Sequence, residues 1–245
     1  MFMIDLPLDS AALTRFAWRQ GHAAGRNPSD DDFGYAVHAW LAAALGGQTP
    51  RPFRLMETPA GLRLLGYAAA DAASLAQHAR DFALPDALAV CDWAAAASKE
   101  MPTTWTVGRR LGFDVRACPV IRGEHERDAY LLEVDQAKAS GREPASRAQV
   151  YAHWLQCQLE RAGAAQAVSG TTNLIGFRRV RTLRQCRAGR DRRLREVERP
   201  DALLSGELLV SNPGAFATLL ARGVGRHRAF GFGMLLLRPP ARGSA

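Results

Sequence analysis

Two histidines in this sequence have neighbours that could support acid–base chemistry, which imidazole suits because its ordinary pKa lies near neutrality. His38 follows Tyr35 by three residues, so both side chains project from one face if the segment is helical. His227 stands between Arg226 and Arg228, where an imidazole could contact a phosphate. Three further histidines lie on helical or polar segments with no partner that the sequence identifies: His78, His125 and His153.

The segment around His38 is expected to be a capped helix. Ser29-Asp30-Asp31-Asp32 supplies an N-cap and three acids at the positive end of the helix dipole, and Gly46-Gly47 ends the helix. A core stripe at i, i+4 and i+8 consists of Val37, Leu41 and Leu45. His38 lies beside this stripe, at the margin between core and solvent. Position alone does not make it catalytic, since a lone helical histidine is more often a surface or half-buried residue.

Positive charge gathers in the second half of the chain. Residues 1–95 carry 7 basic and 10 acidic side chains, whereas residues 96–245 carry 25 basic and 14 acidic ones. Residues 178–199 alone hold ten arginines against three acids, a net charge of +7. Such a segment repels itself unless a polyanion neutralises it, and guanidinium groups suit phosphate oxygens. A nucleic-acid partner is therefore indicated, and the alternative is a solvated basic hairpin with no partner.

The glycine-rich segment 223–233 resembles a nucleotide loop only superficially. Dinucleotide and P-loop motifs run from strand to glycine loop to helix, which places phosphate at a helix N-terminus. Here a helix precedes the glycines and a strand follows them, and no G-K-[ST] motif is present. The glycines could let the backbone approach a nucleic acid while Arg226 and Arg228 face phosphate, or they could form a tight packing turn.

Composition limits the class of protein. The chain has 245 residues, 47% of them hydrophobic, with no apolar stretch long enough for a membrane helix and no visible signal peptide. The four cysteines are far apart and include no C-x-x-C pair. We therefore expect a cytoplasmic protein with reduced thiols, no disulfide framework, no metal site and no cofactor.

The first half of the chain predicts the order β-α-β-β-α-β. Two helical patterns follow the first strand, and one helix separates the later strands. The expected strands are Phe2–Leu8, Pro52–Glu57, Leu62–Ala68 and a short apolar segment near Leu88–Trp93. The helix expected between the last two of these strands is Asp71–Phe82.

The second half predicts the same order again. Ser146 and Gln149 form a capping box for a helix to about Arg161, and Asn212-Pro213 starts a second helix that carries an apolar face. Residues 122–145 look like a polar connection. The expected strands are Leu111–Ile121, Leu174–Arg184, Leu203–Ser211 and Gly231–Arg238. The simplest α+β architecture is two tandem ferredoxin-like (RRM-like) domains over 1–98 and 105–240.

Several segments, in order, resemble the endoribonucleases that process CRISPR repeat transcripts, specifically the CasE branch of type I-E systems. The most specific is GVGRHRAFGFGMLLLRP, which resembles the glycine-rich signature of that family. Tyr35-Ala36-Val37-His38 resembles its Y-x-x-H helix, and the helix with Trp154-Leu155 resembles its W-L helix. The strand ending Arg116-Ala117-Cys118-Pro119 resembles its R-A-N-P strand. Two departures are Cys118 in place of Asn and a longer Ala11–Asp32 region, which indicates an insertion that contains His22.

The resemblance implies a metal-independent endoribonuclease that cuts CRISPR repeat stem-loops by attack of the RNA 2′-hydroxyl. His38 would be the general acid or base, and Tyr35 would orient the RNA or stabilise developing charge. The products would carry a 2′,3′-cyclic phosphate and a 5′-hydroxyl, and the protein would stay on its product as a surveillance-complex subunit. The residues expected to hold the RNA are Arg184, Arg187, Arg190, Arg192, Arg193, Arg226, His227 and Arg228.

Two other functions stay open at this stage. A binding module of the same fold could hold structured RNA within a ribonucleoprotein and do no chemistry. A small-molecule nucleotide enzyme that uses the glycine-rich segment is the less favoured alternative.

Overall fold

The computed structural model describes residues 1–20, 33–188 and 191–241, and over 181–188 and 191–197 it describes the backbone alone. The chain divides into two compact units. Unit 1 comprises Met1–Met101, Val180–Glu198 and Ala229–Gly231, and unit 2 comprises Pro102–Arg179, Arg199–Arg228 and Phe232–Ala245. Within the described ranges, every helix is too short or too polar to cross a lipid bilayer.

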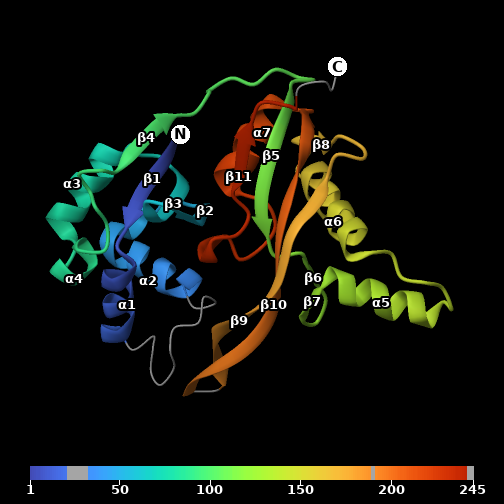
Figure 1. The fold of residues 1–245 in the computed structure, drawn as a ribbon, viewed down its shortest axis with the longest axis horizontal. Coiled ribbons are helices and arrows are strands. Elements are labelled where there is room, and N and C mark those ends of the chain that lie inside the picture. Colours follow the sequence, from blue (N-terminus) through green and yellow to red (C-terminus); the bar gives the residue numbers. More distant parts are fainter. Residues whose placement is uncertain (21–32, 189–190, 242–245) are drawn as a thin grey trace. The chain divides into compact units, whose positions relative to one another are not determined.

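Unit 1 contains a four-stranded antiparallel sheet in the order β2-β3-β1-β4 (Figure 1). This is the strand order of a ferredoxin-like fold, in which the first strand lies beside both the third and the fourth. The elements are β1 (Phe2–Leu8), α1 (Ser10–Arg19), α2 (Phe33–Leu45), η1 (Gly46–Gln48), β2 (Phe53–Thr58), β3 (Gly61–Ala68), α3 (Ala72–Phe82), α4 (Pro85–Leu88) and β4 (Ala97–Glu100).

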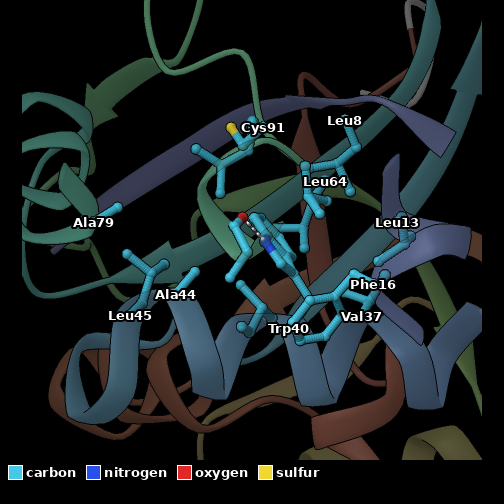
Figure 2. Close-up of a cluster of buried hydrophobic side chains, with 14 of the residues drawn as sticks. Leu8, Leu13, Phe16, Val37, Trp40, Ala44, Leu45, Leu64, Ala79 and Cys91 are labelled. Atoms are coloured by element: carbon cyan, nitrogen blue, oxygen red, sulfur yellow. Dashed lines mark hydrogen bonds between the residues drawn. The ribbon is translucent and has the colours of Figure 1, made fainter. Parts of the chain in front are cut away.

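The helices of unit 1 bury one face of this sheet. Along β1, Ile4, Leu6 and Leu8 alternate inward, as a half-buried strand requires. Figure 2 shows Val37 and Trp40 of α2 projecting toward Leu8 and Leu64 of the sheet. The Trp40 indole nitrogen donates a 2.8 Å hydrogen bond to the carbonyl oxygen of Ala87, so this large buried ring leaves no polar atom unsatisfied. Helix α2 is therefore firmly anchored along its apolar side.

The predicted fourth strand of unit 1 was wrong. The apolar segment near Leu88–Trp93 is a buried connection that makes one isolated bridge, between Leu8 and Cys91. The strand that pairs with β1 is β4, and all four of its side chains are exposed. An edge strand with no buried side chain has no period-2 alternation of apolar residues, so its sequence carries no strand signal. Strand β1 was predicted correctly, and the helix predicted over Asp71–Phe82 is α3.

Unit 2 contains a second antiparallel sheet, in the order β11-β5-β10-β8, and β9 also pairs with β10 (Figure 1). Strand β5 lies between β11 and β10, and β10 also pairs with β9, so the order β11-β5-β10-β9 is ferredoxin-like as well. The elements of this half of the chain are β5 (Arg110–Ala117), β6 (Val120–Arg122), β7 (Glu126–Asp128), α5 (Ala129–Ala139), α6 (Arg147–Arg161), β8 (Ala165–Ala167), β9 (Asn173–Ala188), β10 (Asp191–Val210), α7 (Pro213–Arg222), η2 (Arg228–Phe230) and β11 (Leu235–Arg238). The parts of β9, β10 and η2 that fall within Val180–Glu198 and Ala229–Gly231 belong to unit 1. The predicted tandem ferredoxin-like fold is confirmed.

Three predictions for this half were wrong in their details. The predicted strand Leu111–Ile121 is two strands, β5 and β6, which lie in different sheets. Residues 122–145 are not a polar connection, because they contain β7 and helix α5. Only Ala129 and Ala137 of α5 are buried, so that helix shows no apolar stripe. The last strand begins at Leu235 rather than Gly231, because Gly231 and Gly233 have positive φ angles of 87° and 82°.

The predicted ends of the other two helices of unit 2 were correct. Ser146 and Gln149 form a complete capping box at α6, and the Asn212 side chain caps α7 by accepting from the Ala215 amide. The predicted domain ranges 1–98 and 105–240 stay a prediction.

Candidate functional site

Helix α2 places His38 where the sequence pattern predicted it. Val37, Leu41 and Leu45 are completely buried, whereas Tyr35 and His38 are half-buried on the adjacent side of the helix. The proposed cap at residues 29–32 lies outside the described residues. Because the apolar stripe holds the helix and the imidazole stands beside it, His38 is fixed in position and still reachable from solvent.

A segment of the glycine-rich region contacts this side of α2. The Phe230 ring centroid lies 5.1 Å from that of His38 with a 63° angle between planes, an edge-on contact. The same ring lies 6.1 Å from Tyr35 and nearly parallel to it, at 9°. A Cβ atom added at Gly34 would lie 2.8 Å from the Phe230 carbonyl oxygen, so the two backbones are in close approach. All of these residues belong to unit 1.

The surroundings of His38 favour its neutral form. Burial and then the positive charge of Arg51 lower the pKa of His38 below its usual 6.5. Arg51 is exposed and precedes β2, and its backbone amide donates to the Tyr67 carbonyl oxygen at 2.8 Å. Within the described part of the chain, no residue hydrogen-bonds to either ring nitrogen of His38. A neutral imidazole with open nitrogens can accept a proton at neutral pH.

His227 has different surroundings in unit 2. We call Glu126, Arg199, Arg226 and His227 the Glu126 cluster. The His227 Nε2 lies 3.1 Å from Glu126 Oε2, and Arg199 Nη1 lies 2.5 Å from the same oxygen. Arg226 pairs with the other carboxylate oxygen. Glu126 and Arg199 have side chains that are only 9% and 5% exposed, so this ion pair is internal.

Burial lowers the pKa of His227 to about 4, and Arg199 adds to this effect, while the Glu126 carboxylate partly opposes it. Burial alone would raise the pKa of Glu126, but His227, Arg199 and Arg226 outweigh it and lower that pKa. The cluster is therefore a buried carboxylate neutralised by arginine, with a neutral imidazole beside it.

The other two predicted residues of the glycine-rich segment also have partners within the protein. The Arg226 side chain is 44% exposed although it pairs with Glu126, so part of its guanidinium faces solvent. Arg228 donates from Nη1 to the Arg222 carbonyl oxygen at 2.8 Å, which ties it to the end of α7. The predicted set thus lies in two places, with Tyr35 and His38 in unit 1 and residues 226–228 in unit 2.

Carboxylates from elsewhere in the chain neutralise part of the arginine-rich segment. Arg178 donates to Asp201 at 2.8 Å, Arg116 binds the same carboxylate through two nitrogens, and Arg199 pairs with Glu126. The net charge of +7 counted from the sequence therefore includes two arginines already engaged within unit 2. The side chains of the predicted RNA-contacting arginines on the β9–β10 hairpin lie outside the described residues: Arg184, Arg187, Arg190, Arg192 and Arg193.

Cys118 directly follows β5 and is 1% exposed. It is the residue that departs from the Asn of the R-A-N-P strand described in the sequence analysis. Burial raises the pKa of its thiol to about 12. A thiol in this state is neutral at physiological pH, so it does not act as a nucleophile.

Comparison with known proteins identifies relatives along the whole chain. A family model described as CRISPR associated protein matches residues 1–239. A structure of CRISPR endoribonuclease Cse3 bound to 19 nt RNA aligns with a TM-score of 0.63 at 19% identity, over 98% of this chain and 100% of that one. Thermus thermophilus Cse3 bound to an RNA representing a pre-cleavage complex aligns at 0.58 and 19% identity, covering 97% and 98%.

The CRISPR-associated protein Cas6e from Escherichia coli K-12 aligns with a TM-score of 0.51 at 16% identity, over 98% and 100% of the two chains. At these identities the structural likeness shows a shared fold. No curated protein sequence matches significantly.

Proposed function

We propose that this chain, which belongs to the CRISPR-associated protein family, is a metal-independent endoribonuclease that cuts CRISPR repeat stem-loops in precursor transcripts. The observation that carries the proposal is the state of His38. Its imidazole is half-buried beside a fully buried stripe, its pKa is lowered, and no described residue hydrogen-bonds to its ring nitrogens. The fold shared with RNA-bound Cse3 structures supports the same reading.

RNA contains its own nucleophile, the 2′-hydroxyl beside the scissile phosphate, so the protein must align the reacting groups and move protons. A neutral His38 accepts the 2′-hydroxyl proton as the oxygen attacks phosphorus. The bond from phosphorus to the 5′-oxygen breaks, and that oxygen takes up a proton from water, while the His38 imidazolium returns its own proton to solvent. The products are a 2′,3′-cyclic phosphate and a 5′-hydroxyl.

Two neighbours of His38 have roles in this scheme. The hydroxyl of Tyr35 orients the RNA or stabilises the negative charge that develops on the phosphate oxygens. The Arg51 guanidinium, whose positive charge already acts on His38, offers a cation to a phosphate oxygen at the same place. Arg51 was not singled out from the sequence, because one arginine among thirty carries no local signal.

The arginines of the β9–β10 hairpin hold the RNA stem in this proposal. A-form RNA is held mainly through its shape and its phosphates, which a positively charged β-hairpin suits. The residues assigned to this contact are Arg184, Arg187, Arg190, Arg192 and Arg193, with Arg226, His227 and Arg228 in the glycine-rich segment. The protein stays on its product in the cytoplasm as a subunit of a type I surveillance complex.

The direct test is cleavage of a repeat hairpin from the neighbouring CRISPR array in the presence of EDTA, with wild type beside His38→Ala. Cleavage by the wild type alone supports the proposal. A deoxyribose at the scissile position should stop cleavage and spare binding, because only the nucleophile is removed. Cleavage of that deoxy substrate would rule out the 2′-hydroxyl mechanism.

The second candidate function is a structured-RNA-binding subunit that does no chemistry. The paired strands β9 and β10 with their arginines favour it, since they could bind RNA without any role for His38. Tight binding of the hairpin without cleavage by the wild type or the variant would support this candidate instead.

A further inference from the structure

Phe230 stands out because it is the aromatic residue of the glycine-rich segment that contacts both proposed catalytic side chains. Its ring meets His38 edge-on at 5.1 Å and lies nearly parallel to Tyr35 at 6.1 Å. The positive edge of one ring and the negative face of another attract, so contacts of this kind favour particular ring orientations. The segment Ala229–Gly231 belongs to unit 1 together with α2, so the contact lies within one compact unit.

The backbone of Phe230 also lies close to helix α2. Gly34 lies in the first turn of α2, and an added Cβ there would come within 2.8 Å of the Phe230 carbonyl oxygen. Backbone atoms cannot move aside as the end of a flexible side chain can. Glycine at position 34 therefore permits the approach that brings the Phe230 ring to His38.

We propose that Phe230 is a positioning residue for His38, which holds the imidazole in the orientation needed for proton transfer and shields one side of it from water. The inference rests on the proposed function, in which His38 transfers a proton. It assigns a role to the glycine-rich segment that does not depend on phosphate contact.

The burial pattern indicates that Phe230 positions His38 and is not needed to hold helix α2 in place. Helix α2 is anchored by Val37, Trp40 and Leu41, all fully buried in the core of unit 1, whereas Phe230 is half-buried on another side. Loss of the Phe230 ring should therefore leave the helix in place and release the imidazole. Since burial is the larger cause of the lowered pKa of His38, and Arg51 the other, loss of the ring should also raise that pKa toward 6.5.

The first experiment is an NMR titration of the His38 imidazole without RNA, in wild type and in Phe230→Ala. We expect the His38 pKa to rise in the variant. Single-turnover cleavage of the repeat hairpin at neutral pH should fall roughly 10- to 100-fold, because small misplacements of a catalytic group are costly. RNA affinity should change far less than the rate, and Phe230→Tyr should restore both the titration and most of the rate.

A second variant tests the backbone contact independently. Gly34→Ala should stabilise helix α2 if only local propensity mattered, since alanine is favoured over glycine by about 1 kcal/mol in helix interiors. We expect it instead to lower the cleavage rate and raise the His38 pKa, as Phe230→Ala does. Gly47→Ala is the matched control, because a Cβ there meets nothing within 4 Å. Phe82→Ala is the control for the ring, since Phe82 contacts His78 at 4.8 Å and is 74% exposed.

Unchanged His38 titration and unchanged cleavage in both Phe230→Ala and Gly34→Ala would overturn the positioning role. Equal losses of rate in Gly47→Ala or Phe82→Ala would overturn it as well, because the effect would then be general destabilisation. If the wild type cuts no repeat hairpin, the proposed function fails. The titration still decides whether Phe230 controls the state of His38.

Discussion

His38 and His227 both have a pKa lowered by burial, but different charged groups surround the two rings. The charged neighbour that acts on His38 is Arg51, and no described residue hydrogen-bonds to its ring nitrogens. His227 has a carboxylate on Nε2 and two arginines around that carboxylate. One imidazole is half-buried with no hydrogen bond from a described residue, and the other is part of an internal ion-pair network.

This difference shows that a perturbed pKa does not by itself mark a catalytic residue, since ion-pair networks perturb pKa values too. From the sequence, His227 looked suited to phosphate contact because it lies between two arginines. In the structure, His227 is a neutral ring that lies against Glu126, whose charge Arg199 and Arg226 balance, and phosphate binding by His227 stays a proposal.

The largest expected effect is the difference in cleavage rate between variants of His38 and His227. His38→Ala should lower the single-turnover rate roughly 10²- to 10⁴-fold at saturating RNA, the usual contribution of a general acid or base. His227→Ala should mainly raise the RNA concentration that gives half of the maximal rate, and it should lower the rate at saturation less than His38→Ala does. Rate measurements in EDTA over a range of enzyme concentrations distinguish the two. Similar losses at saturation from both variants would contradict the comparison.

The Glu126 cluster should contribute to stability. Glu126→Gln leaves the buried Arg199 without its countercharge, and breaking a buried pair in this way costs about 3–5 kcal/mol. Arg226→Ala removes a partly exposed partner of the same carboxylate and should cost about 1 kcal/mol or less. Urea denaturation of the two variants and the wild type measures the difference. Equal midpoints for both variants would show that the buried pair has no special importance.

Acid should destabilise the fold through His227. Its pKa in the folded protein is about 4, below the usual 6.5, so the unfolded chain binds a proton first as the pH falls. The stability associated with the neutral ring is complete above pH 6.5 and is lost as the pH falls through 4. His227→Gln should flatten the dependence of the urea midpoint on pH over this window. An unchanged slope would mean that His227 titrates normally.

The smallest expected effect concerns Arg51. Arg51→Gln removes the cation that helps to lower the pKa of His38, so the acid limb of log kcat/KM should move to higher pH. The rate at pH 8, where His38 is neutral in either protein, should fall only if Arg51 also binds phosphate. Arg80→Gln on α3 is a control that removes the same charge elsewhere in unit 1. A shift to lower pH would contradict the electrostatic role.

Local signals in the sequence predicted the elements that bury an apolar pattern or carry a side-chain cap. Strand β1 was predicted at its observed bounds and buries alternate apolar residues, and α6 was predicted from the capping box of Ser146 and Gln149. Strand β4 was missed because its exposed side chains leave no such pattern. Helix α5 was missed because it buries only Ala129 and Ala137, although the Asp128 side chain caps it. Those elements form through backbone pairing and contacts that depend on the rest of the fold, which no local window contains.

The sequence by itself determined the family resemblance, the tandem ferredoxin-like order and the position of His38 beside a core stripe, because each depends on neighbouring residues or on the order of elements. Only the tertiary structure decided which histidine stands open and which lies against a carboxylate. It also decided that Phe230 and Gly34 meet at His38. The physical reason is that burial and ion pairing are set by groups far away in the chain, and these contacts exist only once the backbone has folded.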